Sequence, residues 1–181
     1  LFTIFVNTQS FSNEKIQDIN IVGNDRISEE TIIMFSGIEK NQKINENKIN
    51  NIIKNLYNIN FFNKIEIEFK DNLLSIFLEE NPLIQNITYK GIKSKSLRNT
   101  VLSNVSLKSR TSFSNILLEQ DKIKISNNLK TQGYFFSQIS IKKKFLEDNK
   151  VDLEFDIILG DKSKIKEIKF IGNKIFKDKK L

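Results

Sequence analysis

The chain of 181 residues has no cysteine and no histidine, and it contains a single proline. Without cysteine, neither a disulfide framework nor a thiolate metal site can form. Without histidine, imidazole catalysis and histidine-based metal binding are also excluded. The sequence has no uninterrupted run of about 18 apolar residues, so it predicts no transmembrane helix. These absences remove most of the familiar hydrolase and metalloenzyme chemistries.

The net charge of +7 is unevenly distributed along the chain. Residues 15–81 carry 8 basic and 11 acidic side chains, whereas residues 82–162 carry 14 basic and 8 acidic ones. A basic C-terminal part suits a nucleic-acid or anionic-membrane surface. The alternative is that the abundance of lysine, asparagine and isoleucine reflects a biased codon supply, and we favour this second interpretation.

One short pattern occurs three times in the sequence. It begins at Ile16, Ile84 and Ile165, with apolar residues at offsets 0, 3 and 5 and a glycine at offset 7. Each copy predicts a strand that runs into a turn, because glycine accepts a positive φ angle without a Cβ clash. The copies start 68 and 81 residues apart, which indicates a row of small domains.

The first repeat predicts the order strand, helix, helix, strand, strand. Ser28 is a candidate N-cap of the first helix, and Gly37 is expected to end it. Alternation of apolar and charged residues then predicts a strand at residues 64–69 and a returning strand after a turn at 70–72. Five apolar side chains at helical spacing predict the second helix: Ile49, Ile52, Ile53, Leu56 and Tyr57.

The second repeat predicts the same order of elements. Its first helix is expected to extend to Val105, and its second helix to follow an N-cap at Ser114. The closing hairpin is expected to start at Gln138 and to turn near residues 147–149. An aromatic pair follows the second helix in both repeats, and we expect it to pack in the core. The predicted buried residues are Ile49, Ile52, Leu56, Phe61, Phe62, Leu129, Tyr134 and Phe135.

Tandem repeats of this order resemble POTRA domains, the polypeptide-transport-associated modules of outer-membrane assembly proteins. The resemblance rests on residues 19–27, 56–62 and 78–84, and residues 168–176 fit the opening of a further domain. It is closest to the periplasmic arm of the BamA family. The fold class that it implies is α+β, with tandem β-α-α-β-β domains that each have a three-stranded mixed sheet covered by two helices.

The repeats and the resemblance divide the chain into four parts. We expect a first POTRA-like domain at residues 15–81, a second at 82–162 and the start of a third at 163–181. Residues 1–14 are expected to be a signal-peptide remnant or a disordered N-terminus, because an apolar run there is followed by a small-x-small triplet. The joints are short, so we expect limited hinging, at Asn81, Pro82, Gly160 and Asp161.

The resemblance also implies a function. It implies the periplasmic arm of an outer-membrane protein assembly factor, at the periplasmic face of the bacterial outer membrane, joined to the membrane through a β-barrel outside this fragment. Its partners would be unfolded outer-membrane proteins and accessory lipoproteins, bound by β-augmentation of the strand after the second helix. The expected binding residues are Lys64, Ile65, Glu66, Ile67, Glu68, Phe69, Gln138, Ile139, Ser140, Ile141 and Lys142.

Three alternatives remain open. The first is a POTRA arm of another transporter, either TamA-like or a two-partner secretion pore. The second is a basic nucleic-acid-binding module, although the G-x-x-G loop of KH modules and the sheet-face aromatics of RRM modules are missing. The third is an enzyme, but the sequence has no phosphate-binding loop or nucleophile elbow. We therefore expect no catalytic, cofactor-binding or metal-binding residue and no nucleic-acid partner.

Overall fold

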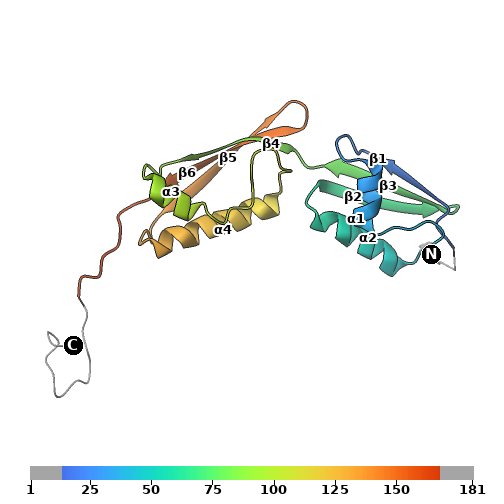
Figure 1. Cartoon of the computed structure of the whole chain (residues 1–181), viewed down its shortest axis with the longest axis horizontal. Helices are drawn as coiled ribbons and strands as arrows, with labels where there is room; N and C mark the ends of the chain where they lie inside the picture. The colour runs from blue at the N-terminus through green and yellow to red at the C-terminus, as the bar shows by residue number, and fades with distance from the viewer. Residues whose placement is uncertain (1–13, 168–181) are drawn as a thin grey trace, which may run out of the picture.

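The computed structural model describes residues 14–167, which form two α+β units placed end to end along the long axis of the molecule (Figure 1). The first unit consists of β1 (Asp18–Val22), α1 (Glu29–Ser36), α2 (Glu46–Asn58), β2 (Phe62–Lys70) and β3 (Leu73–Glu80). The second unit consists of β4 (Leu83–Lys90), α3 (Lys95–Val101), α4 (Asn115–Thr131), β5 (Gln138–Leu146) and β6 (Lys150–Ile158).

Each unit has its own three-stranded sheet, and the strand orders are β1-β3-β2 and β4-β6-β5. The first strand of each unit is parallel to the central strand, and the other edge strand is antiparallel to it. The predicted fold class, tandem β-α-α-β-β domains with mixed sheets, is therefore confirmed. The predicted signal-peptide remnant, apart from Glu14, and the predicted opening of a further domain at residues 168–176 lie outside the described residues.

The helices begin at the polar residues that the sequence indicates. Ser28 and Ser114, the predicted N-caps of α1 and α4, each accept a hydrogen bond from the backbone N–H three residues later. Gly37 ends α1 in the left-handed conformation, with a φ angle of 69°. The prediction that α3 extends to Val105 is wrong, because α3 ends at Val101. The loop that follows is held instead by the buried carboxylate of Asp121.

The repeated glycine ends β1 and β4 in a conformation that other residues rarely adopt. Gly23 and Gly91 have φ angles of 89° and 91°. A Cβ atom built on Gly23 would lie 2.0 Å from the carbonyl oxygen of Leu78, and one built on Gly91 would lie 1.7 Å from that of Ile157. Glycine is thus required both for its φ angle and for the close approach of the central strand.

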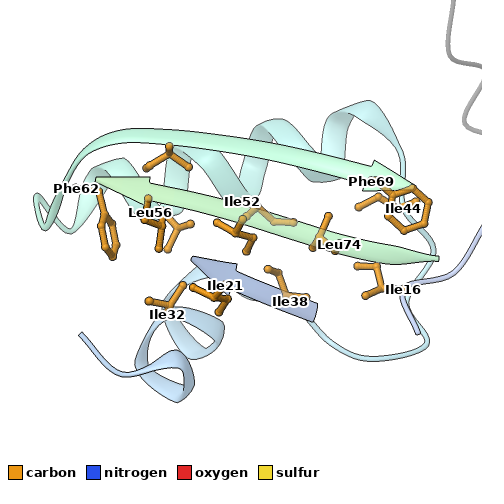
Figure 2. Close-up of a cluster of buried hydrophobic side chains, with 13 residues drawn as sticks. Ile16, Ile21, Ile32, Ile38, Ile44, Ile52, Leu56, Phe62, Phe69 and Leu74 are labelled. Atoms are coloured by element: carbon orange, nitrogen blue, oxygen red, sulfur yellow. The ribbon is translucent and has the colours of Figure 1, made fainter. Parts of the chain in front are cut away.

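The core of each unit lies between the helices and one face of the sheet, as Figure 2 shows for the first unit. Of the predicted core residues, Ile52, Leu56, Phe62 and Leu129 are buried. Three more, Ile49, Phe61 and Tyr134, are half-buried and pack against the two cores.

One core prediction is wrong, because the side chain of Phe135 is 55% exposed. In the first unit the aromatic pair is Phe61–Phe62, and its second member is the first residue of β2. In the second unit the chain turns at Gly133, where φ is 90°, and β5 starts only at Gln138. The longer turn packs Tyr134 against the core and leaves Phe135 on the surface.

Candidate functional site

The strands β2 and β5 form open edges of the two sheets. Within residues 14–167, β2 pairs only with β3 and β5 pairs only with β6, and each has nine residues. The opposite edges are partly covered, because backbone hydrogen bonds join Ile16 to Asn41 and Gln42, and Ile84 to Arg110 and Thr111. The strands predicted to bind partners therefore lie at the two longest uncovered edges.

The open edge β2 is charged on the outer face of the sheet and apolar on the face toward the helices. Ile65 and Phe69 are buried and Ile67 is half-buried, whereas Lys64, Glu66 and Glu68 are exposed. The Lys64 ammonium lies 2.7 Å from a Glu66 carboxylate oxygen, and this hydrogen bond raises the pKa of Lys64. Charged side chains on an edge strand oppose uncontrolled pairing with other chains.

The open edge β5 is basic and has no buried residue. Ile139 and Ile141 are half-buried against the second core, while Gln138, Ser140 and Lys142 are exposed or partly exposed on the other face. Lys142 and Lys90 reach Glu154 on the central strand, at 3.5 Å and 2.6 Å. The hydrogen bond from Lys90 is the main reason that the pKa of Glu154 is lowered.

The hairpin turn decides which backbone groups of β2 face the open edge. Residues 71–72 have φ angles of 51° and 63°, as a two-residue type I′ turn requires. Such a turn makes Lys70 and Leu73 a hydrogen-bonded pair, and hydrogen-bonded and non-hydrogen-bonded pairs then alternate along the strands. The N–H of Glu66 is therefore directed to β3, whereas the N–H of Ile67 is directed to the open edge.

A buried carboxylate anchors the end of the first unit, next to the joint between the two units. The Glu80 side chain is only 2% exposed, and it lies 2.7 Å from the Arg26 guanidinium. Its other oxygen accepts hydrogen bonds from the backbone N–H groups of Arg26 and Ile27, at 2.8 Å and 2.9 Å. Sequence reasoning missed Arg26, because 54 residues separate it from Glu80 and no local pattern links them.

Two of the expected hinge residues lie inside this joint. Asn81 is buried, its backbone N–H donates to Phe61, and its carbonyl accepts from Arg26. The carbonyl of Pro82 accepts from the N–H of Phe113 at 2.7 Å. Across the joint, the side-chain amide of Asn149 donates to the carbonyl of Glu80 at 2.9 Å. The first joint is thus held by hydrogen bonds from both units.

The other expected hinge residues, Gly160 and Asp161, follow β6. Gly160 has a φ angle of 67°. The chain here is tied to the second unit by a hydrogen bond from the N–H of Ser163 to the carbonyl of Gly133, at 2.9 Å. The Lys162 ammonium also lies 5.8 Å from the centre of the Tyr134 ring.

Between residues 14 and 167, no three His, Cys, Asp or Glu side chains gather where they could hold a metal ion. In the same range, no helix combines the length and the apolar character needed to cross a membrane.

Comparison with known proteins identifies the family. The family model named POTRA, described as a surface antigen variable number repeat, matches residues 14–81 and 82–158. The chain belongs to the POTRA family, as the sequence resemblance predicts.

Two curated relatives align with the whole chain, and both are named outer membrane protein assembly factor BamA. The protein from Neisseria meningitidis serogroup B is 27% identical over 185 residues, covering 100% of this chain and 23% of the relative. The protein from Neorickettsia risticii is 24% identical over 193 residues, covering 100% of this chain and 24% of the relative. The chain thus spans about a quarter of the length of the relatives it matches.

Two solved structures share the fold. The N-terminal domain of Omp85 from Thermosynechococcus elongatus superimposes with a TM-score of 0.56 and 12% identity, covering 80% of this chain and 63% of that one. POTRA1-2 of the periplasmic domain of Omp85 from Anabaena gives a TM-score of 0.53 and 8% identity, covering 83% of this chain and 98% of that one.

Proposed function

We propose that this chain is the periplasmic POTRA arm of an outer-membrane protein assembly factor. In this role it binds extended segments of unfolded β-barrel clients and of accessory lipoproteins by β-augmentation. The observation that carries the proposal is that each POTRA unit leaves the same strand, β2 or β5, open along nine residues. An open edge recognises main-chain groups and so accepts clients of many sequences.

The proposal extends to the organisation of the whole protein. The first domain covers residues 15–81, the second 82–162, and residues 163–181 begin a third. The limits of the family match, 14–81 and 82–158, support this division. Hinging would occur at Asn81–Pro82 and Gly160–Asp161, and the arm would stand at the periplasmic face of the outer membrane, ahead of a β-barrel. The naming of both curated relatives as BamA supports this arrangement over another transporter.

The test uses a pair of proline variants on β2. Ile67→Pro removes an N–H that is directed to the open edge, which an edge strand tolerates. Glu66→Pro removes an N–H directed to β3 and should destabilise the fold. An extended, alternating peptide from an outer-membrane protein is titrated into each isotope-labelled chain, and the amide chemical shifts are followed.

The proposal expects shifts along β2 and β5 in the unmodified chain. In Ile67→Pro, shifts on β2 should disappear while those on β5 remain, because only one edge has lost a donor. Circular dichroism checks that this variant stays folded, and Glu66→Pro shows what loss of the sheet looks like. Shifts confined to the helices would contradict β-augmentation.

A further inference from the structure

Two adjoining cavities lie where the open edges meet, at the joint between the domains. One has a volume of about 230 Å³ and the other about 320 Å³, and both are lined by Asn63 and Asn115. Asn63 is the second residue of β2, and the larger cavity also contains Phe145, near the end of β5. One end of each open edge strand therefore lies at this hollow.

Three exposed apolar side chains surround this hollow. Tyr57 and Ile116 line the smaller cavity, and Phe145 lines the larger one. Their exposed fractions are 44%, 67% and 64%. The buried Asn81 lines both cavities, and the buried Phe62 and Phe113 line one each. A hollow of this kind suits one apolar side chain of an extended polypeptide, flanked by backbone that hydrogen-bonds to asparagine.

The two edges also run in the same direction through the joint. β4 begins at the joint, β6 is parallel to it, and β5 is antiparallel to β6, so β5 runs toward the joint. β3 ends at the joint, and β2 is antiparallel to β3, so β2 runs away from the joint. A polypeptide laid along both edges would therefore keep one polarity, and it would not have to reverse between the domains.

The two edges differ in charge. β5 carries three consecutive lysines, residues 142–144, whereas β2 carries Glu66 and Glu68 between Lys64 and Lys70. Lys142 already contacts Glu154, and Lys143 contacts the Asn115 side chain at 3.0 Å. A bound segment with carboxylates opposite β5 would therefore be electrostatically complementary to the arm. A segment with its carboxylates opposite β2 instead would lose this complementarity.

We propose that a single extended segment of an unfolded client binds both edges at once. It lies antiparallel to β2 and β5, the slightly more stable pairing, with an apolar side chain in the hollow at the joint. Its N-terminal half lies on β2 and its more acidic C-terminal half lies on β5. This inference rests on the proposed function and adds the length, direction and charge order of the segment that the arm accepts.

Continuity through the joint makes the two edges cooperate. Two strands of nine residues require a segment of at least about 18 residues, or roughly 60 Å when extended. Once one half is bound, the other half is held near the second edge at an effective concentration in the millimolar range. A long segment should therefore bind at least about 100-fold more tightly than either half alone.

The test uses a synthetic peptide of about 22 residues, alternating apolar and polar residues with glutamates in its C-terminal half. A nitroxide is attached to either end, and the broadening of backbone amides is measured in the chain of residues 1–181. A label at the N-terminus should broaden the region of Lys70, and a label at the C-terminus should broaden the region of Gln138. The nine-residue halves are titrated separately.

Matched variants on α4 test the hollow. Ile116→Ser alters the hollow, whereas Ile123→Ser alters a residue on the same helix that is 59% exposed and lines neither joint cavity. Ile116→Ser should weaken the long peptide about 10-fold, by the loss of one apolar contact. It should leave the affinity for the nine-residue halves unchanged. Ile123→Ser should change the affinity neither for the long peptide nor for the halves.

The outcomes separate this inference from the proposed function. Suppose that a label at one end of the peptide broadens the amides near both Lys70 and Gln138, or that the nine-residue halves bind as tightly as the long peptide. Each edge then binds its own segment. The spanning segment is then excluded, and the proposed function stands. If labels at the two ends give the reverse pattern, the antiparallel direction is wrong and the inference fails. If no peptide binds at all, both the inference and the proposed function fail.

Discussion

The two domains have the same fold but attach their edge strands differently. In α2 and α4, residues that lie 73 positions apart are both buried, as the pairs Ile52 and Ile125, and Leu56 and Leu129 show. By contrast, β2 has three buried residues and β5 has none. The second helix and the central strand therefore supply buried residues to the core of both domains, whereas the edge strand supplies them only in the first.

The second helices also hold the preceding loop with opposite charges. In the first domain, the ammonium of Lys48 donates to the carbonyl of Gly37 at 2.9 Å. The position 73 residues later is Asp121, which is fully buried and accepts hydrogen bonds from the N–H groups of Ser106 and Leu107. The loop can present either carbonyls or amides to the helix, as long as the side chain there completes the hydrogen bonds.

The largest expected effect separates the aromatic pairs of the two domains. Phe62→Ala should cost about 3–5 kcal/mol, because it leaves a cavity in a well-packed core. Phe135 is the matching residue of the second domain, since each lies six positions after the buried leucine of the second helix. Phe135→Ala should cost less than about 0.5 kcal/mol, because this side chain is exposed. Urea unfolding measures both. Equal losses would show that the two domains pack their aromatic residues alike.

The next effect concerns the loop-holding side chains. Asp121→Ala should cost about 3 kcal/mol, because it leaves the N–H groups of Ser106 and Leu107 without their acceptor and also breaks the ion pair with Lys124. Lys48→Ala should cost less than about 0.5 kcal/mol, since water replaces an exposed ammonium. Thermal unfolding of both variants provides the measurement. Hydrogen exchange at Leu107 should accelerate in Asp121→Ala; an unchanged rate would mean that the carboxylate does not order the loop.

A smaller effect concerns the joint between the two domains. Arg26→Ala should cost about 1–2 kcal/mol, because the buried Glu80 loses its cation while a partly exposed arginine is removed. It should also let the two domains tumble more independently, which ¹⁵N relaxation detects. Lys40→Ala is the control, since it breaks only an exposed ion pair with Asp18. Unchanged relaxation in Arg26→Ala would mean that other contacts hold the joint.

The smallest effect depends on pH and is confined to the second domain. Burial raises the pKa of Tyr89 to about 12, whereas the matching residue of the first repeat is Ile21. The pKa of Tyr89 is near 10 in the unfolded chain and higher in the folded one, so folding favours the neutral phenol. The stability that the neutral phenol contributes is complete below about pH 10 and is lost as the pH rises through about 12. Above pH 10 the native chain should therefore lose stability relative to Tyr89→Phe, as urea unfolding at several pH values measures. A difference independent of pH would contradict this.

The order of elements could be read from the sequence because it depends on local rules. Alternation in β2 and β6, helical spacing in α2, and the caps at Ser28 and Ser114 each depend on neighbours within a few residues. The repeated glycine was also identified from its position alone. The repeat supported these local predictions, since the same order of elements is unlikely to be predicted twice by chance.

Only the tertiary structure decided the joint, the surface position of Phe135 and the direction of the open edges. Arg26 and Glu80 meet across 54 residues, so no local pattern could pair them. Phe135 is exposed because three residues of turn shift the start of β5, a matter of how the turn packs against the core. The common polarity of β2 and β5 follows from strand pairing between distant segments, which depends on contacts that sequence spacing does not encode.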